Sequence, residues 1–413
     1  MNLAVSQANR ISNVKIPIGL IGPDAQAFDG QSADGCLSGN LILSEGKVVG
    51  MVPSFSSDPP RVVMPALTEA HVHLDKCHTI HRMEGIGGDL AAALAAQAAD
   101  KAQWTEADLR TRAKRGLDEL IAAGCGLVRT HVDWGDADVP PLAWEVISNL
   151  ATEARTHIMV GLAALTGIDQ MADADRAERI AGYVAATGGA LGSFLLTHAH
   201  RREGVRNVFA MADRFGLAVD FHVDEGLTPG LDGLEIIADT AFDMGFEGPV
   251  LCGHAVSLIN YTGADLARVL DKVARAGLHV VSLPTTNLYL QGRTGGTPDR
   301  RGLTRLHELV RAGVSVAIGT DNVADAFCPV GRHDPLASLH TAILAGHLDP
   351  PFGQWLETIT TNPTRALGRD PRWIAGAPID TLRISNASNL VDLIAGHLGP
   401  LIPLTDILEA ETE

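Results

Sequence analysis

The 413-residue sequence predicts an α/β fold, a (β/α)₈ barrel of the TIM type with a small β module formed from the N- and C-terminal segments. Three observations predict this fold. From residue 61 onward, short apolar runs alternate with amphipathic stretches of helical length, which is typical of repeated βα units. Eight such runs span roughly 280 residues, close to the usual barrel size of about 250 residues. No GxGxxG follows the first run, which counts against a doubly wound open sheet.

The expected elements follow in chain order. Before residue 61 the sequence holds short β-prone runs separated by turns, and Pro59-Pro60 ends them. Barrel strands are predicted at Val62–His73, Gly126–Asp133, His157–Leu165, Ala190–His198, Leu217–Asp224, Pro249–His254, Leu278–Pro284 and Val314–Asp321. Helices are predicted at Glu106–Ala123, Pro141–Glu153, Ala172–Thr187, Val205–Phe215, Asp232–Met244, Ala264–Ala276, Gly302–Ala312, Pro335–His347 and Gln354–Leu367. Glycines such as Gly124 and Gly216 stand where a helix should end before the next strand.

The chain is expected to form two units. Residues 64–369 make the barrel, and residues 1–63 together with 370–413 make the small β module. The tail segments Arg383–Ile394 and Leu401–Glu413 are expected to return to the N-terminal strands.

Composition and charge exclude several classes of protein. Apolar residues make up 46% and charged residues 20% of the chain, which is ordinary globular usage rather than that of a disordered or fibrous protein. The net charge of −17 would repel DNA or an acidic membrane face, so neither nucleic acid nor membrane is expected as a partner. Five scattered cysteines without a CxxC pair suit a reducing compartment. With no signal-peptide pattern and no run of 18 apolar residues, the sequence predicts a cytoplasmic protein, either monomeric or a homo-oligomer.

Polar residues gather where the predicted strands end, which is the face of a barrel that carries its chemistry. These residues are His71, His73, His131, Asp133, His198, His222, Asp224, Glu225, His254, Asp321 and Asn322. His71 and His73 are two apart on a strand, so both imidazoles point to the same side and can reach one ion. With 16 histidines, about 0.6 such pairs are expected by chance, and His198 and His200 form a second one. The pair alone is therefore a weak signal.

The joint pattern is more specific than the pair. His71, His73, His222 and Asp321 fall at the ends of strands one, five and eight, and strand one neighbours strand eight in a closed barrel. Imidazole nitrogens and a carboxylate oxygen suit one divalent metal ion, zinc or iron. The sequence therefore predicts a metal site at this rim.

Five segments carry a family resemblance: Ala70–Asp75 (AHVHLD), Val128–Asp133 (VRTHVD), Asp220–Glu225 (DFHVDE), Asn287–Gly302 (NLYLQGRTGGTPDRRG) and Ile318–Val323 (IGTDNV). On these segments the sequence resembles the amidohydrolase superfamily and, within it, the cytosine deaminase branch, to which the fourth segment is specific. The match runs from about residue 63 to residue 335. The stretch from residue 71 to 76 also looks similar to N-isopropylammelide amidohydrolase, a triazine-degrading member.

The resemblance implies a role for each matching residue. His71, His73 and His222 would bind one metal ion, and Asp321 would complete the site and take a proton from the bound water. Glu225 would carry protons to the ring nitrogen and the leaving amine, and His254 would hold and polarise the attacking hydroxide. Physical chemistry agrees, because a divalent cation lowers the pKa of bound water to about 7 and an amine leaves poorly unless an acid protonates it.

The resemblance also bears on the number of ions. Binuclear members of the superfamily use a carbamylated lysine at the end of strand four, whereas this chain has no lysine between Lys114 and Lys272. One ion is therefore expected. Lys76 is predicted to pair with a loop carboxylate. His131 and Asp133 are candidates for orienting the ligands, and His198 is expected to be an ordinary polar residue, like His200.

The expected substrate is a nitrogen heterocycle, and three pocket positions count against cytosine itself. Cytosine deaminases read the pyrimidine with a glutamine after strand three, but Val160–Gly167 contains none. Their second aspartate after strand eight is Asn322 here, and their pocket tryptophan is Phe327; both are predicted to bind substrate. We expect a metal-dependent hydrolytic deaminase that acts on a cytosine analogue, an aminotriazine or a pterin. The alternatives are hydrolysis that releases an N-alkyl amine or opens a cyclic amide, and a non-catalytic barrel that keeps a structural metal.

Overall fold

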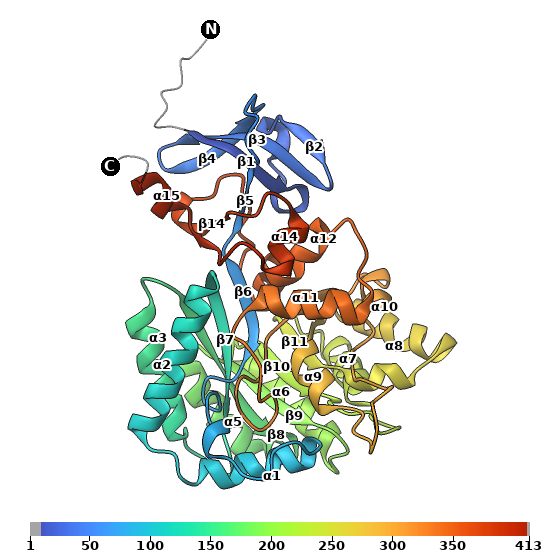
Figure 1. Cartoon of the computed structure of the whole chain (residues 1–413). Helices are drawn as coiled ribbons and strands as arrows, with labels where there is room; N and C mark the ends of the chain where they lie inside the picture. Colours follow the sequence, from blue (N-terminus) through green and yellow to red (C-terminus); the bar gives the residue numbers. More distant parts are fainter. Residues whose placement is uncertain (1–9, 411–413) are drawn as a thin grey trace.

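The computed structural model describes residues 10–410 and contains two sheets, one of eight strands and one of seven. The eight-stranded sheet is the barrel, and the mixed seven-stranded sheet lies beyond one end of it (Figure 1). The barrel strands are β6 (Leu67–Val72), β7 (Cys125–Asp133), β8 (Met159–Gly167), β9 (Ala190–Leu195), β10 (Val219–Val223), β11 (Val250–His254), β12 (His279–Ser282) and β13 (Ser315–Ile318). Each pairs in parallel with the next. The predicted barrel is confirmed.

The barrel closes between its first and last strands by a few polar contacts. The backbone N–H of Asp321 donates to the carbonyl of His71 at 2.9 Å. The fully buried carboxylate of Glu69 accepts from the N–H of His71 at 2.8 Å and from that of Thr320 at 3.0 Å. The ends of β6 and β13 are therefore held side by side, as the metal-site prediction requires.

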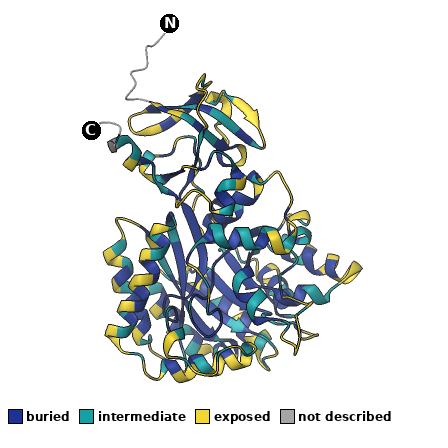
Figure 2. Ribbon diagram, in the orientation of Figure 1, coloured by how far each residue is buried: buried dark blue, intermediate teal, exposed yellow. Residues whose placement is uncertain are grey.

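Helices surround the barrel between successive strands. They are α2 (Glu106–Ala122), α3 (Leu142–Ala154), α4 (Ile168–Met171), α5 (Ala174–Ala186), α6 (Arg201–Phe215), α7 (Gly233–Met244), α8 (Gly263–Arg275), α9 (Pro284–Leu290), α10 (Leu306–Arg311) and α11 (Pro335–Gly346). Their inner faces are buried against the strands, while their outer faces are exposed (Figure 2). This is the amphipathic pattern from which most of these helices are predicted.

Two predicted helices differ from the observed ones. The segment Gln354–Leu367 breaks into α12 (Gly353–Leu356), a 3₁₀ turn and α13 (Thr361–Ala366). Pro363 lacks an N–H and would clash with the carbonyl of residue 359 in a continuous helix. The segment Gly302–Ala312 becomes helical only at Leu306, because Gly302 has a left-handed backbone with φ of +77°.

One helix that the sequence analysis missed, α1 (Leu90–Lys101), lies at the end of the barrel opposite the mixed sheet (Figure 1). Its alanine-rich sequence has high helix propensity. Its N-terminus is capped by Asp89, whose side chain accepts from the N–H of Ala92 at 3.1 Å. Because the strands run away from the mixed sheet, α1 lies beside their carboxyl ends.

The first predicted strand, Val62–His73, is wrong as a single element. It splits at Ala66 into β5 (Arg61–Pro65), which joins the mixed sheet, and β6 of the barrel. Pro65 cannot donate to a ladder, and the N–H of Ala66 donates instead to the carbonyl of Thr381 at 2.9 Å. Both strands are buried on both faces, so the apolar pattern shows no break between them.

The mixed sheet contains strands from both ends of the described chain. Its order is β15-β14-β5-β1-β3-β2, with β4 paired to β3. The strands not yet given are β1 (Arg10–Pro17), β2 (Gln31–Ala33), β3 (Cys36–Ser44), β4 (Lys47–Val52), β14 (Leu382–Ser385) and β15 (Ile402–Pro403), and the tail adds α14 (Leu390–Ala395) and α15 (Leu404–Ala410). The small β module predicted from the two ends is thus present. Its division at 63/64 and 369/370 stays a proposal, and β5 continues past the first boundary; residues 1–9 and 411–413 lie outside the described residues.

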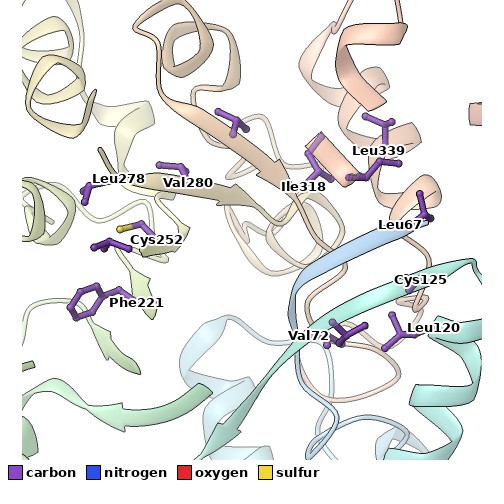
Figure 3. Close-up of a cluster of buried hydrophobic side chains, with 14 of the residues drawn as sticks. Leu67, Val72, Leu120, Cys125, Phe221, Cys252, Leu278, Val280, Ile318 and Leu339 are labelled. Carbon is purple, nitrogen blue, oxygen red and sulfur yellow. The ribbon is translucent and has the colours of Figure 1, made fainter. Parts of the chain in front are cut away.

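The hydrophobic core fills the space between the barrel and its helices and orients the site. Val72 is fully buried and lies near Leu120 of α2 (Figure 3). Phe221, which precedes His222, is likewise buried in this layer (Figure 3). Since neighbouring residues on a strand face opposite sides, an apolar residue facing the helices turns its histidine neighbour toward the barrel centre. No helix within residues 10–410 has the length and hydropathy needed to cross a bilayer.

Candidate metal centre and substrate cavity

The four predicted ligands converge at the carboxyl ends of three strands. His71 and His73 come from the end of β6, His222 from β10, and Asp321 from just after β13. Nε2 of His73 lies 3.1 Å from Nε2 of His222. Oδ1 of Asp321 lies 3.5 Å from Nε2 of His71 and 3.3 Å from Nε2 of His73. The imidazoles of His73 and His222, which are 149 residues apart in sequence, therefore come into contact.

These residues fit a divalent metal ion. Both ring nitrogens of His71 and both carboxylate oxygens of Asp321 are buried without a hydrogen-bond partner, whereas buried polar groups normally have one. Burial lowers the pKa of His73 and of His222 well below the usual range of histidine, so their lone pairs are free. Nitrogen and oxygen ligands about 2.0–2.2 Å from one ion lie roughly 3.4 Å from each other, close to the separations found.

His131 of β7 joins the cluster, although the sequence analysis left its role open. One of its ring nitrogens lies within 4.8 Å of ligand atoms of His71, His73 and His222. Its Nε2 lies 3.0 Å from Oδ1 of Asp220, a buried carboxylate. Asp220 therefore orients the His131 ring, which packs 4.1 Å from the ring of His71.

Local backbone features make room for the cluster. A Cβ at Gly253 of β11 would lie 2.7 Å from Cε1 of His71, so only glycine leaves space for that imidazole. The neighbouring His254 has φ of +69°, and Asp321 has φ of +60°. Non-glycine residues rarely adopt this left-handed backbone, and such strain tends to occur at functional sites.

A second group of side chains borders the cluster. Oε1 of Glu225, two residues beyond β10, lies 3.6 Å from Nδ1 of His254 at the end of β11. The side-chain amide of Asn287 donates to Oε1 of Glu225 at 3.4 Å and lies 3.2 Å from Nδ1 of His254. Gln291 donates to the Glu225 carbonyl at 3.2 Å. Asn287 and Gln291 belong to the run Asn287–Gly302 that carries the family resemblance, so this run holds Glu225 in place.

The pKa values of Glu225 and Asp321 are shifted in opposite directions. Burial and the nearby Asp321 raise the pKa of Glu225 well above its usual range, which favours the protonated form of its carboxyl. Burial alone would raise the pKa of Asp321 as well, but the nearby imidazoles of His71 and His73 lower it well below its usual range. Burial lowers the pKa of His254 to about 3, so this imidazole is neutral. If Asn287 donates to Nδ1, the proton of His254 is on Nε2. Two carboxyl groups whose pKa values are shifted in opposite directions can divide the roles of acid and base.

A cavity of about 490 Å³ opens beside these groups. Its volume is in the usual range for small-molecule sites. Apolar residues from α1 and the strand ends make up much of its wall, among them Leu90, Leu94, Leu165, Phe194, Leu195 and Phe327. Its polar lining includes His73, His222, Glu225, His254, Asp321 and Asn322. The predicted substrate-binding residues Asn322 and Phe327 therefore both face the space next to the cluster.

The Asn322 amide is held in one orientation. Its Nδ2 donates to Oδ2 of the buried Asp325 at 2.6 Å. Oδ1 of Asp325 accepts from the N–H groups of Phe327 at 2.9 Å and Cys328 at 3.0 Å. The side-chain amide oxygen of Asn322, Oδ1, has no hydrogen-bond partner among the described residues and is available as an acceptor.

Comparison with known proteins identifies the family. Residues 81–375 match the model of the amidohydrolase family. The chain belongs to this family. It is 32% identical to pterin deaminase of Rhizobium rhizogenes over 388 residues, which cover 91% of this chain and 87% of the relative. It is 22% identical to N-isopropylammelide isopropyl amidohydrolase of Pseudomonas sp. (strain ADP) over 81% of this chain and 82% of the relative.

A solved structure agrees with these sequence relatives. The amidohydrolase superimposes on 5-methylcytosine deaminase of Klebsiella pneumoniae, bound to 5-fluorocytosine, with a TM-score of 0.77 and 25% identity, covering 95% of this chain and 96% of that one. The predicted resemblance to the cytosine deaminase-like branch is confirmed. The protein is a hydrolase of carbon–nitrogen bonds other than peptide bonds.

Some residues lie elsewhere in this amidohydrolase than the sequence suggested, or were not singled out by it. Asp133 pairs with Lys101 at 3.0 Å rather than bordering the histidines. Gln97 of α1 and Gln170 of α4 line the cavity, although no glutamine was found in the stretch after strand three. Both amide atoms of Gln97 are buried without a partner. The sequence feature that could have identified Gln97 is its position as a polar residue among the alanines of α1.

Three further residues complete the comparison with the prediction. His198 lines the cavity, but its Nδ1 accepts from the N–H of Leu196 at 2.9 Å, and His200 is exposed at the start of α6. That both are ordinary polar residues stays a prediction. The salt bridge predicted for Lys76 is wrong, because no carboxylate oxygen among the described residues lies within 4.0 Å of its Nζ. Lys76 turns inward to the cavity instead.

Proposed function

We propose that this amidohydrolase is a metal-dependent deaminase that hydrolyses the exocyclic amino group of a 2-amino-4-oxopteridine, a pterin. The observation that carries the proposal is the contact of Glu225 with His254, 3.6 Å between Oε1 and Nδ1, in the same cavity as the predicted ligands. The relative named pterin deaminase, 32% identical over 91% of this chain, supports the choice of substrate.

One zinc or iron ion would be held by the four predicted ligands, His71, His73, His222 and Asp321. When bound, such an ion lowers the pKa of a water molecule to about 7 and so supplies hydroxide at neutral pH. Asp321, whose pKa its histidine neighbours hold low, would be the acceptor for the proton that such a water gives up. His254 donates its Nε2–H to the attacking oxygen and keeps it directed at the ring carbon.

Glu225 supplies the protons that the reaction needs. Its carboxyl first protonates the ring nitrogen beside the carbon under attack, and Asp321 returns a proton that Glu225 then passes to the amino group. As the oxo group forms, the remaining proton of the added oxygen returns to Glu225. The C–N bond breaks only after this protonation, because NH₂⁻ is too poor a leaving group. One water is consumed, and the products are the oxo heterocycle and ammonia.

Ammonia release from a heterocycle panel tests this function. The metal-loaded full chain is assayed with pterin, cytosine, 5-methylcytosine, an aminotriazine and N-isopropylammelide. Pterin is expected to have the highest kcat/KM. Release of isopropylamine without deamination of any other compound would favour the alternative that the 22% identical relative suggests. Bound metal with no turnover on the whole panel would favour a non-catalytic barrel.

Replacing Glu225 tests the proposed proton carrier. E225Q keeps the size of the side chain but cannot shuttle a proton, so kcat is expected to fall by about 10²- to 10⁴-fold with metal content unchanged. The exposed Glu247 provides the matched control, and E247Q should keep wild-type kcat. A fully active E225Q would contradict the assigned role.

A further inference from the structure

The substrate cavity contains two lysines with different surroundings. Nζ of Lys101 lies 3.0 Å from Oδ2 of Asp133 and donates to the Asp133 carbonyl at 3.0 Å. Lys76 follows β6 and is only 6% exposed, yet its ammonium group has no hydrogen bond and no carboxylate oxygen within 4.0 Å among the described residues. A lysine this largely buried without such partners is unusual, since buried charges are normally paired, and its ammonium group borders the cavity.

The acidic residues around Lys76 are engaged elsewhere. Oδ2 of Asp75 accepts from the N–H of Asp133 at 2.9 Å. Asp325 holds Asn322 and two backbone N–H groups, and Asp133 pairs with Lys101. Burial alone would lower the pKa of Lys76, but the charges of Asp133, Asp75 and Asp325 raise it, so the amine is protonated. The negative charges of these carboxylates favour the protonated form of Lys76, but none of them accepts a hydrogen bond from its ammonium group.

Phe327 fixes where the ammonium lies. Nζ of Lys76 sits 5.4 Å from the centroid of the Phe327 ring, within the range of a cation–π contact. Both residues line the cavity, as does Asn322, whose amide oxygen is free. This wall therefore presents an aromatic ring, a cation that can donate and a neutral oxygen that can accept. A planar heterocycle with an exocyclic oxygen beside a ring N–H complements these groups.

We propose that Lys76 is a specificity-determining residue that binds a negatively polarised oxygen of the substrate, the oxo group of an oxo-amino heterocycle. This inference rests on the proposed function and deepens it. Addition of hydroxide to the amino-bearing carbon moves electron density into the ring and onto a conjugated oxo oxygen. A cation held at that oxygen stabilises the transition state more than the bound substrate. Lys76 thereby selects substrates that carry this oxygen.

Selectivity between matched substrates tests the role. The probes are pterin, 2,4-diaminopteridine (in which an amino group replaces the oxo group) and pterin-6-carboxylate. For the metal-loaded full chain, K76M is expected to lower kcat/KM for pterin by about 10- to 100-fold, as expected for the loss of a charge-assisted hydrogen bond. It should change kcat/KM for 2,4-diaminopteridine far less. K76R keeps the cation and should restore part of the selectivity.

Lys101 provides the matched control, because it is the other lysine of the cavity. K101M is expected to change kcat/KM for pterin and 2,4-diaminopteridine in the same proportion. If K76M impairs only pterin-6-carboxylate, the bound oxygen belongs to a carboxylate substituent and the oxo assignment is overturned. If K76M leaves the ratio of the three kcat/KM values at its wild-type value, Lys76 does not select the substrate.

Direct binding separates this inference from the proposed function. Calorimetric titration of wild type and K76M with lumazine, the dioxo product expected from pterin, measures the Lys76 contact without turnover. Tighter binding to wild type than to K76M supports the contact even if no probe releases ammonia, in which case only the proposed function fails. Equal affinity, or no binding to either protein, overturns the Lys76 assignment.

Discussion

At the scale of single residues, the site is defined by polar atoms that the protein itself does not satisfy. The imidazole of His71 has no hydrogen-bond partner at either nitrogen, and neither has the carboxylate of Asp321. An unpaired buried polar group costs about 1–3 kcal/mol, so several together at one point indicate a ligand that supplies the missing contacts. Burial lowers the pKa of His73 and of His222, which suits binding of a cation.

Removal of one imidazole tests the metal site at this scale. H222A takes away a ligand from β10, so metal affinity is expected to fall by at least about 10- to 100-fold, the loss seen even for partners outside the ligand set. Elemental analysis of the dialysed variant measures it. His198 lines the same cavity but bonds the Leu196 N–H, so H198A should keep its metal. Equal metal content in H222A and wild type would contradict the predicted ligand set.

At the scale of elements, α1 and α2 are fastened to the loops around the cavity. Arg82 binds Asp100 near the C-terminal end of α1, and Lys101 binds Asp133 at the end of β7. On α2, Glu119 accepts from Nδ1 of His333 at 2.8 Å and lies 3.1 Å from Nε2 of His78. The contacts of Asp100 and Lys101 hold α1 against the cavity that its leucines line, and those of Glu119 hold α2 to the loops after β6 and β13.

The Glu119 contacts predict a pH dependence of stability. The hydrogen bond from His333 is the main cause that lowers the pKa of Glu119 from 4.5 to about 2. A carboxyl group with a lowered folded-state pKa stabilises the fold above its unfolded pKa, and this contribution disappears as pH falls through the folded value. The stability difference between wild type and E119Q should therefore be largest above pH 4.5 and shrink toward pH 2.

Denaturant unfolding between pH 3 and pH 7 measures this difference. E153Q is the control, because Glu153 forms an exposed ion pair with Arg110 and should change stability little. A difference that stays constant over the range would contradict the prediction. The three side chains of this cluster also have the composition of a metal site. Their hydrogen bonds, with Arg115 on the other oxygen of Glu119 at 3.0 Å, account for their arrangement.

At the scale of the whole molecule, the metal site depends on closure of the barrel. Glu69 lies between the first and last barrel strands and accepts from both, through His71 and Thr320. E69A would leave two buried N–H groups unpaired, so the free energy of unfolding is expected to fall by about 2–6 kcal/mol. E69Q keeps one acceptor and should lose about 1–3 kcal/mol.

Urea unfolding of the metal-free protein measures these losses without a contribution from metal binding. The exposed Glu45 lies in the turn between β3 and β4 and provides the control, since E45A removes no buried contact. If E69A were as stable as wild type, the closure would not depend on this carboxylate.

Much of the site could be read from local patterns. Apolar runs alternating with amphipathic segments predict the barrel, because each βα unit must bury one strand and one helix face. The barrel in turn places its strand ends at one rim, which predicts that His71 and His73 meet His222 and Asp321. The roles of Glu225 and His254 followed from the family resemblance and stay proposals.

Other features depend on contacts between segments that are distant in sequence. The break at Ala66 is invisible in the apolar run, because β5 and β6 are both buried but in different sheets. Lys101 pairs with Asp133, whereas Lys76 has no such partner because the carboxylates near it already bind other groups. The sequence by itself determined the barrel and the identity of four ligand candidates, because both follow from the period of strands and helices. Only the tertiary structure decided which polar groups stay unsatisfied in the cavity, because that depends on every neighbour the folded chain brings to each atom.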